Sequence, residues 1–150
     1  MTHRGSYAIR AVLALARADG ADVVPARTIA REMDIPVRFL PQVLGDLNRA
    51  GIVEARLGRA GGYRLSKSAA DISLLDIIEA SEGDARRRTC VLTGQPCGSS
   101  PDPCDVHPMF FDAQEAILAR LAKTSVGAVV AGSAGRRSNG AGVSEETSAS

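Results

Sequence analysis

The chain has 150 residues, 45% of them hydrophobic, and a formal net charge of +1. This length suits one compact domain, and no apolar run approaches the roughly 18 residues of a transmembrane helix, so we expect no membrane partner. The N-terminus lacks the basic region, apolar stretch and cleavage site of a signal peptide, so we expect a cytoplasmic protein.

Composition and charge distribution favour a helical protein that meets a polyanion. Aromatic residues make up only 3% of the chain, which leaves Leu, Ile, Val and Ala to build a mostly α core. Residues 1–67 carry 11 Lys and Arg against 6 Asp and Glu, whereas the remainder carries 7 against 11. Clustered positive charge attracts phosphate, although a chance asymmetry is the alternative.

Two short helices separated by a tight turn are expected after a buried first helix. The first helix is predicted over residues 7–18, which are rich in Ala and Leu. The next two are predicted over residues 25–33 and 37–50. Between them, Ile35 precedes a proline and is pushed out of the α region. Pro41 marks the first turn of the third helix, because a proline deeper in a helix removes an internal hydrogen bond.

A glycine-rich basic hairpin is expected next. Gly51 ends the third helix, residues 52–57 predict a strand, and a second strand follows the glycines at positions 58, 61 and 62. The hairpin completes the order of elements found in a winged helix-turn-helix, which we therefore predict over residues 1–82. The expected fold class is mostly α with a small β-hairpin.

The predicted winged helix indicates which side chains contact double-stranded DNA. Its second short helix would lie in the major groove, where Arg38 and Gln42 are the candidates for base contacts. Phosphate or wing contacts are predicted for the other arginines, Arg49, Arg56, Arg59 and Arg64. Any one of them alone is as well explained by a solvated surface charge, but together they favour a DNA-binding protein.

A fourth helix and a long loop follow the hairpin. Ser73 and Asp76 have the spacing of a capping box, which predicts a helix over residues 74–81. Residues 83–108 then form a loop rich in Gly and Pro that contains all three cysteines.

The last predicted helix is amphipathic and has few partners left within the chain. Its pattern covers residues 109–123, inside a segment that we extend to 109–130. Its apolar face could pack on a second copy or on the first helix of its own chain. After position 130 the composition turns to Gly, Ser and Ala, so residues 131–150 are predicted to be a disordered tail.

The cysteine-containing loop predicts a metal or redox site. In a reducing compartment an odd number of clustered cysteines argues against structural disulfides. Three thiolates and an imidazole within one loop can converge on a metal centre, and they are Cys90, Cys97, Cys104 and His107. Their wide spacing favours an iron-sulfur cluster over a structural zinc ion, while a thiol redox switch and unliganded cysteines remain alternatives.

No catalytic motif accompanies these elements. The sequence shows no nucleophile with a base partner, no phosphate-binding loop and no paired catalytic carboxylates, so we expect that the protein is not an enzyme. An electron carrier or enzyme built around the cluster is the alternative from another functional class.

Long stretches of the chain resemble the Rrf family of winged-helix iron-sulfur transcriptional regulators. They are GSYAIRAVLALA, IPVRFLPQVLGDLNRAGIVEARLGRAGGYRLSKSA, ISLLDIIEASEG and the three-cysteine loop. The resemblance implies a homodimer joined through the 109–130 helix, and a cluster that changes promoter affinity, most simply as a repressor, when it is lost, oxidised or nitrosylated. Iron supply, nitric oxide and redox state are the signals that it implies.

The resemblance also implies a ligand set. In members with a two-iron cluster, three cysteines and a histidine are the ligands, which correspond to Cys90, Cys97, Cys104 and His107. Other members take a ligand from the partner's first helix, but Ser6 and Arg10 occupy those positions here and cannot serve comparably. A two-iron (2Fe-2S) cluster is therefore favoured over a four-iron (4Fe-4S) one. The gaps between cysteines are each one residue longer than in the two-iron pattern. Pro41 replaces an acidic residue that influences operator choice, so the operator is not transferred.

Overall fold

A computed structural model of the chain describes residues 2–18, 23–84, 90, 92 and 104–139. Three helices, α1 (His3–Arg17), α2 (Ala26–Glu32) and α3 (Leu40–Arg49), form the helix-turn-helix part. Helix α1 starts four residues earlier than the apolar pattern predicts, because the side chain of Thr2 caps it by accepting the Gly5 N–H at 3.3 Å. The buried Ala and Leu residues of α1 then form the centre of the core.

The predicted tight break between α2 and α3 is confirmed. Asp34 has a positive φ of 51°, and Ile35 is only 3% exposed and donates its N–H to the Ala30 carbonyl at 2.9 Å. The guanidinium of Arg10 holds this turn by donating to the carbonyls of Met33 and Asp34 at 3.2 and 3.3 Å. The turn therefore stays fixed to α1.

Helix α3 begins later than the sequence indicates. Residues 37–39 form a turn, and Pro41 occupies the second position of the helix, where the missing N–H costs nothing. Leu40, Leu44 and Leu47 are buried against the core. The solvent-exposed polar face of α3 is therefore shorter than that of a helix over residues 37–50.

The predicted hairpin is present as an antiparallel pair. Strand β1 (Val53–Arg56) pairs with β2 (Gly62–Leu65), with Val53 opposite Leu65. Val24 adds a short bridge, because its backbone exchanges hydrogen bonds of 2.8 and 2.9 Å with Tyr63. A side chain on Gly62 would clash with the Val24 carbonyl, so that glycine permits a close backbone approach.

The predicted capping box begins helix α4 (Leu74–Glu82). The Ser73 hydroxyl accepts the Asp76 N–H at 3.1 Å, and the Asp76 carboxylate accepts the Ser73 N–H at 2.9 Å. A short 3-10 turn, η1 (Ala69–Asp71), connects the wing to this helix. Helix α4 packs on both α1 and α3, and it completes the winged helix-turn-helix core.

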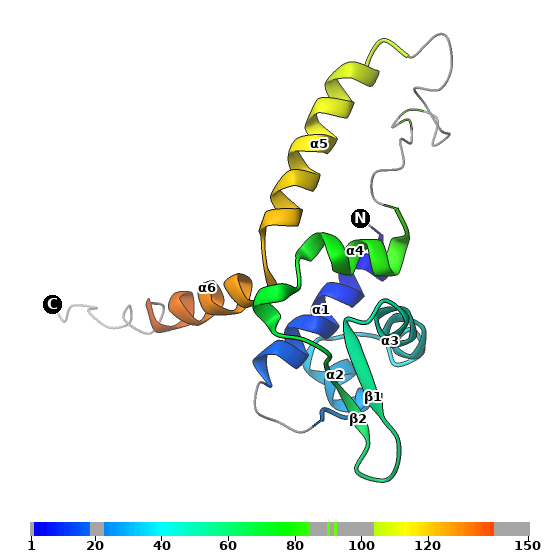
Figure 1. Cartoon of the computed structure of the whole chain (residues 1–150), viewed down its shortest axis with the longest axis vertical. Helices are drawn as coiled ribbons and strands as arrows, with labels where there is room; N and C mark the ends of the chain where they lie inside the picture. Colours follow the sequence, from blue (N-terminus) through cyan, green and yellow to red (C-terminus); the bar gives the residue numbers. More distant parts are fainter. Residues whose placement is uncertain (1, 19–22, 85–89, 91, 93–103, 140–150) are drawn as a thin grey trace, which may run out of the picture.

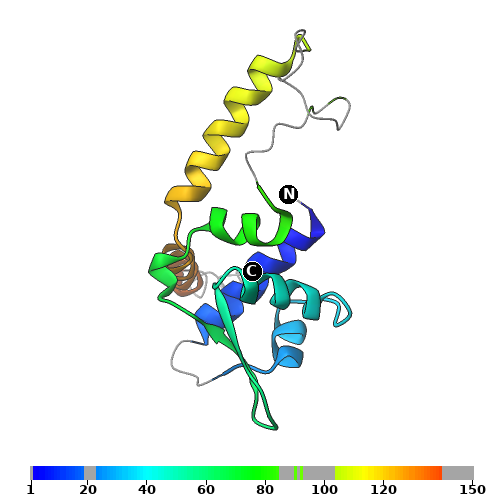
Figure 2. The same ribbon diagram turned by 45° about the vertical axis from the view of Figure 1, so that its right-hand side comes forward.

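The C-terminal part differs from the prediction of one helical segment over 109–130 and a disordered tail from 131. Helix α5 (His107–Lys123) projects from the core, and a separate helix α6 (Val126–Asn139) leaves in another direction (Figures 1 and 2). Residues 131–139 are therefore helical, which corrects the start of the predicted tail, and residues 140–150 lie outside the described part.

Long-range hydrogen bonds explain the break between α5 and α6. Thr124 is extended and its carbonyl accepts the Leu74 N–H at 3.0 Å, while the Val126 N–H donates to the Ile72 carbonyl at 2.8 Å. The Ser125 hydroxyl then caps α6 by accepting the Ala128 N–H at 3.1 Å. Val126 is fully buried, so α6 is anchored on α1 and η1. Among the described helices, none combines the length and apolar character needed to cross a membrane.

Candidate DNA interface and cysteine site

The two candidates for base contacts lie on different parts of the helix-turn-helix. Gln42 is exposed in the first turn of α3, as predicted. Arg38, predicted at the start of that helix, instead lies in the preceding turn, where its guanidinium stands 4.8 Å from the centre of the Phe39 ring. Ring and guanidinium attract each other through a cation–π contact, so Phe39 rather than helix geometry orients Arg38.

An ion-pair network lies behind the exposed end of α3. Asp46 is only 4% exposed, and its carboxylate pairs with both Arg4 and Arg49. The Arg4 Nε atom donates to it at 2.9 Å. A buried carboxylate needs such partners, because desolvation would otherwise disfavour its charge. The network fixes α3 to the first turn of α1.

Sequence reasoning missed Arg4 and the burial of Asp46. The spacing of Asp46 and Arg49 by three residues was the available local signal, since residues so spaced are neighbours on a helix. Nothing local shows that Arg4 approaches from α1. Arg49 keeps 74% of its side chain exposed, so it is paired and still accessible to a phosphate.

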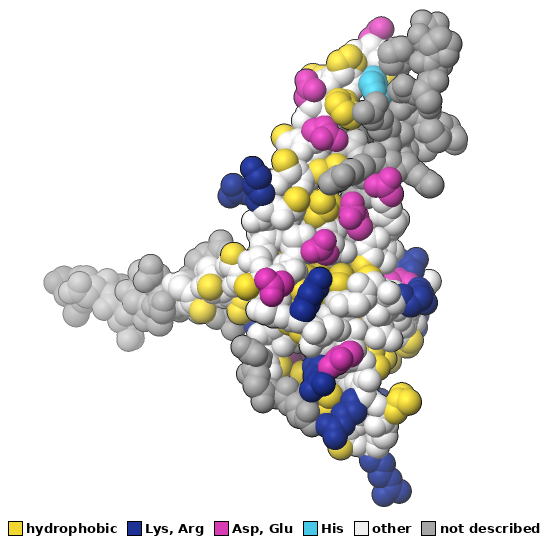
Figure 3. Space-filling view, in the orientation of Figure 1, with side chains coloured by type: hydrophobic (Ala, Val, Ile, Leu, Met, Phe, Trp, Pro, Cys, Tyr) yellow, Lys and Arg dark blue, Asp and Glu magenta, His cyan; other side chains and the backbone are white. Residues whose placement is uncertain are grey.

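The wing carries the remaining predicted DNA contacts. Arg56 and Arg64 lie on the two strands, Arg59 lies in the turn between them, and all three are exposed. Arg64 pairs with Glu54, its cross-strand neighbour, which leaves part of its charge neutralised. Figure 3 shows several Lys and Arg side chains toward the wing end of the molecule and several Asp and Glu along α4 and α5, with Lys and Arg also present beside α5.

Two of the three cysteines lie close together in the described part of the chain. Cys90 is 8% exposed, Cys104 is half-buried, and their Sγ atoms are 3.8 Å apart. Two thiolates bound at about 2.3 Å to one tetrahedral metal would stand about 3.8 Å apart, whereas a disulfide measures about 2.05 Å. This pair of sulfur atoms fits the chemistry of a shared metal ion.

The other two predicted ligands, His107 and Cys97, are not placed beside this pair of sulfur atoms by the described residues. His107 is the first residue of α5; its N–H donates to the Cys104 carbonyl at 2.9 Å, and its ring stacks on Phe111 with centroids 6.2 Å apart. Cys97 lies outside the described residues. Within the described ranges, no group of three or more His, Cys, Asp or Glu side chains is close enough to hold a metal ion.

The residue that precedes the cysteine-containing loop, Glu82, is held in place by hydrogen bonds to Thr2. Glu82 ends α4, and its Oε1 accepts the Thr2 N–H at 2.6 Å and the Thr2 hydroxyl at 2.8 Å. Partial burial alone would raise the pKa of Glu82, but the hydrogen bonds from Thr2, together with weaker effects of the N-terminal charge and the Gly5 N–H, lower the pKa below its ordinary value. The same turn of α1 therefore contacts α4 through Thr2 and α3 through Arg4.

Comparison with known proteins identifies relatives of this arrangement. Residues 1–132 match the model of the Rrf2 family, described as an iron-dependent transcriptional regulator. An rrf2-like HTH-type transcriptional regulator of Rhodobacter capsulatus is 32% identical over 117 residues, covering 73% of this chain and 78% of its own. The HTH-type transcriptional regulator IscR of Escherichia coli O1:K1 / APEC is 28% identical over 130 residues, covering 87% of this chain and 79% of its own.

A solved structure supports the fold. The chain of CymR (YrzC), named the global cysteine regulator of B. subtilis, superposes with a TM-score of 0.73 at 22% identity. The superposition covers 87% of this chain and 95% of that one. At this identity the likeness concerns the fold alone. It confirms the predicted mostly α winged-helix architecture.

Proposed function

The chain belongs to the Rrf2 family of iron-dependent transcriptional regulators, and from that premise we propose that it is a homodimeric repressor whose promoter affinity is set by an iron-sulfur cluster. DNA binding is the shared activity of this family of transcriptional regulators. The cluster, its ligands, the dimer and the sign of regulation are the proposed parts. The signal would be loss, oxidation or nitrosylation of the cluster, in response to iron supply, redox state or nitric oxide.

The Cys90–Cys104 pair is the observation that carries the proposal. Their sulfur atoms lie 3.8 Å apart although 13 residues separate them in sequence, and Cys90 is buried. Burial keeps water from the Cys90 sulfur atom, and thiolates suit iron better than carboxylates do. Cys97 and His107 would supply the other two ligands of a two-iron cluster. When bound, the cluster would supply a reversible redox centre.

The positions of the ligands suggest how cluster binding would affect the DNA interface. Cys90 and Cys104 fall within the segment 83–106 that joins Glu82 of α4 to His107 of α5. Ligation would hold that segment in one arrangement and so fix α5 relative to the winged helix. Since dimeric helix-turn-helix proteins read half-sites about one DNA turn apart, a change at α5 would alter the fit of both recognition helices.

Helix α5 supports the homodimer. None of its residues is buried, and Met109, Phe110 and Ile117 are 66%, 43% and 60% exposed. A helix with an apolar stripe facing solvent gains stability when a second copy covers it. The alternative that we considered from sequence, packing of this helix on α1, is not needed, because α5 packs on α4 and α6 takes the place against α1.

The experiment that tests the cluster is purification without oxygen followed by an absorbance spectrum and analysis of iron, acid-labile sulfide and zinc. The proposal predicts visible absorbance with equal iron and sulfide, two of each per chain for the two-iron form. Cys90→Ser and Cys104→Ser should lose both, while the loop control Ser99→Ala should keep both. Stoichiometric zinc without sulfide would contradict the iron-sulfur cluster.

A thiol switch is the second candidate function, favoured by the same short distance. A peroxide could oxidise the two thiols to a disulfide, with two protons and two electrons leaving the sulfur atoms and water as the reduced product. The likeness in fold to CymR, which is named a cysteine regulator, adds to this alternative. Iron-free protein treated with hydrogen peroxide would then lose two hydrogens in mass and change its DNA affinity, and Cys97→Ala would leave that response intact.

A further inference from the structure

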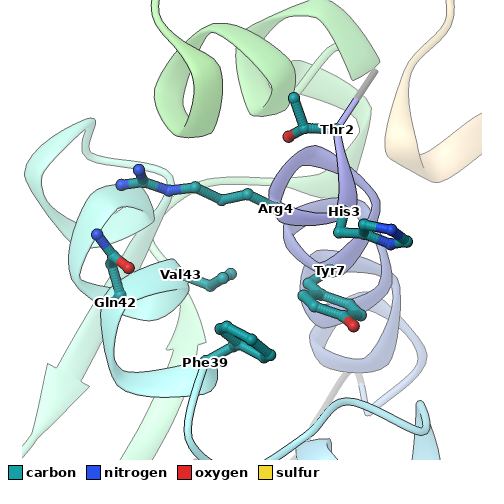
Figure 4. A pocket seen from close by; sticks show the side chains of 7 residues that line it. All are labelled: Thr2, His3, Arg4, Tyr7, Phe39, Gln42 and Val43. Carbon is teal, nitrogen blue, oxygen red and sulfur yellow. The ribbon is translucent and has the colours of Figure 1, made fainter.

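A cavity of about 470 Å³ lies between the start of α1 and the start of α3. Figure 4 shows Arg4 and Tyr7 reaching into it from α1, and Phe39, Gln42 and Val43 facing them from the other side. Small-molecule sites in proteins typically measure about 300–1,000 Å³ and combine apolar walls with a few polar groups. This cavity has that size and that mixture.

The walls of the cavity are shaped for a flat, apolar group. The Tyr7 and Phe39 rings are nearly stacked, with centroids 5.7 Å apart and planes 28° from parallel, and Val43 is only 1% exposed. Aromatic rings favour offset-stacked or edge-on neighbours at such distances. A planar aromatic ring is the ligand group that these side chains match.

The rim of the cavity favours an anion. A guanidinium stands beside each ring, since Arg10 lies 5.6 Å from the Tyr7 centroid and Arg38 lies 4.8 Å from that of Phe39. The Arg4 guanidinium lines the cavity itself. The nearby carboxylates are Asp46, which Arg4 and Arg49 share, and Glu82, which binds Thr2. Arg4 is the one arginine among the described residues that line the cavity, and Arg10 and Arg38 stand beside its two aromatic rings. Carboxylates pair well with the planar guanidinium.

We propose that this cavity binds a small aromatic carboxylate and that the ligand and operator DNA exclude each other. Gln42 supports the mutual exclusion of ligand and DNA. Its exposed side chain lines the cavity and is also the candidate for reading a base in the major groove. Ligand binding must then weaken DNA binding, and DNA must weaken ligand binding by the same factor.

This site would give the regulator a second input, independent of the cluster. Neither of the two described cysteines lines it, and its described walls come from the winged-helix part alone. Failure of the cluster would therefore leave the ligand site intact, and failure of the ligand site would leave the cluster intact.

The test is titration calorimetry on the full chain with 1-naphthylacetate, its neutral analogue 1-naphthylacetamide, and acetate. The proposal predicts one saturable site per chain for the naphthyl carboxylate, binding about fivefold weaker for the amide, and no binding of acetate. Tyr7→Leu and Arg4→Gln should each weaken binding about fivefold or more, and Arg4→Lys should restore part of it. Arg17→Gln, an exposed arginine in the last turn of the same helix, is the matched control and should bind as the parent does.

A second arm measures competition with a fluorescent DNA duplex that the protein itself selects from a random pool. Saturating 1-naphthylacetate should lower DNA affinity, and the effect should vanish in Tyr7→Leu, whose far-ultraviolet circular dichroism and unfolding midpoint confirm folding. Equal binding of acid and amide, unchanged binding in both cavity variants, or unchanged DNA affinity at saturation would each overturn the proposal. Ligand-induced dissociation of a dimer would also overturn it, because the cavity would then belong to a contact with a second copy.

Discussion

The first helical turn of the chain connects two functional regions, because Thr2 binds the carboxylate of Glu82 with hydrogen bonds of 2.6 and 2.8 Å. Glu82 is the last residue before the cysteine-containing segment, and Arg4, two residues after Thr2, pairs with Asp46 of the recognition helix. A displacement of the end of α4 can therefore change the position of α3, because both helices contact the first turn of α1.

The Thr2–Glu82 contact predicts a defined pH dependence. Because the folded pKa of Glu82 lies below its ordinary value of 4.5, its contribution to stability is present above that value and is lost as pH falls through the folded pKa. We expect Glu82→Gln to lower the free energy of unfolding by less than about 1 kcal/mol at pH 7, since the pair is exposed. Urea unfolding at pH 7 and below pH 4.5 should show the difference between parent and variant shrinking at the lower pH. A constant difference would contradict the assignment.

The Asp46 network predicts a larger effect on stability. Asp46→Ala removes a buried carboxylate that joins α1 to α3, and we expect a loss of about 1–3 kcal/mol because the partners Arg4 and Arg49 keep contact with water. Asp71→Asn, at an exposed carboxylate in η1, is the control and should lie within about 0.5 kcal/mol of the parent. Denaturant unfolding compares the two. Equal stability of both variants would show that the network does not fix α3.

The recognition helix and the wing predict two different kinds of DNA defect. Gln42→Ala should cost about 1–3 kcal/mol of binding on the selected duplex and relax preference at one base pair. Arg59→Ala, in the wing turn, should weaken binding to all sequences alike and reduce the salt dependence by about one phosphate contact. Fluorescence anisotropy at several salt concentrations separates the two. Uniform weakening by Gln42→Ala would assign that residue to the phosphate backbone.

The apolar stripe of α5 predicts an assembly that one substitution can break. Ile117→Glu places a charge where we expect a second copy to pack, and the chain should become monomeric in sedimentation-velocity experiments. Ala119→Glu, two residues further along the same helix and so on its other side, should keep the dimer. Identical sedimentation of both variants would place the interface elsewhere.

Local sequence signals predicted the elements that local interactions build. The capping box of Ser73 and Asp76, the turn at Ile35 and the hairpin all depend on residues within a few positions of each other. The basic character of the wing could likewise be predicted, because it follows from residue types that remain at the surface.

Features set by long-range contacts could not be predicted in the same way. The break at Thr124 depends on hydrogen bonds to Leu74 and Ile72, some fifty residues earlier, so the pattern alone suggested one segment over 109–130. The burial of Asp46 depends on Arg4 arriving from another helix. For the cysteine site, spacing and resemblance supplied the candidate ligands, and the structure adds the proximity of Cys90 and Cys104.

The DNA affinity of the cluster-loaded protein, compared with that of Cys97→Ala, tests the central claim most directly. Both proteins are prepared without oxygen and titrated with the selected duplex at one salt concentration, and sedimentation confirms that both are dimers. The account predicts that the variant lacks visible absorbance and differs from the parent in affinity by about fivefold or more, which is the range of ordinary allosteric coupling. Equal affinities for a loaded parent and a cluster-free dimeric variant would contradict control of DNA binding by the cluster.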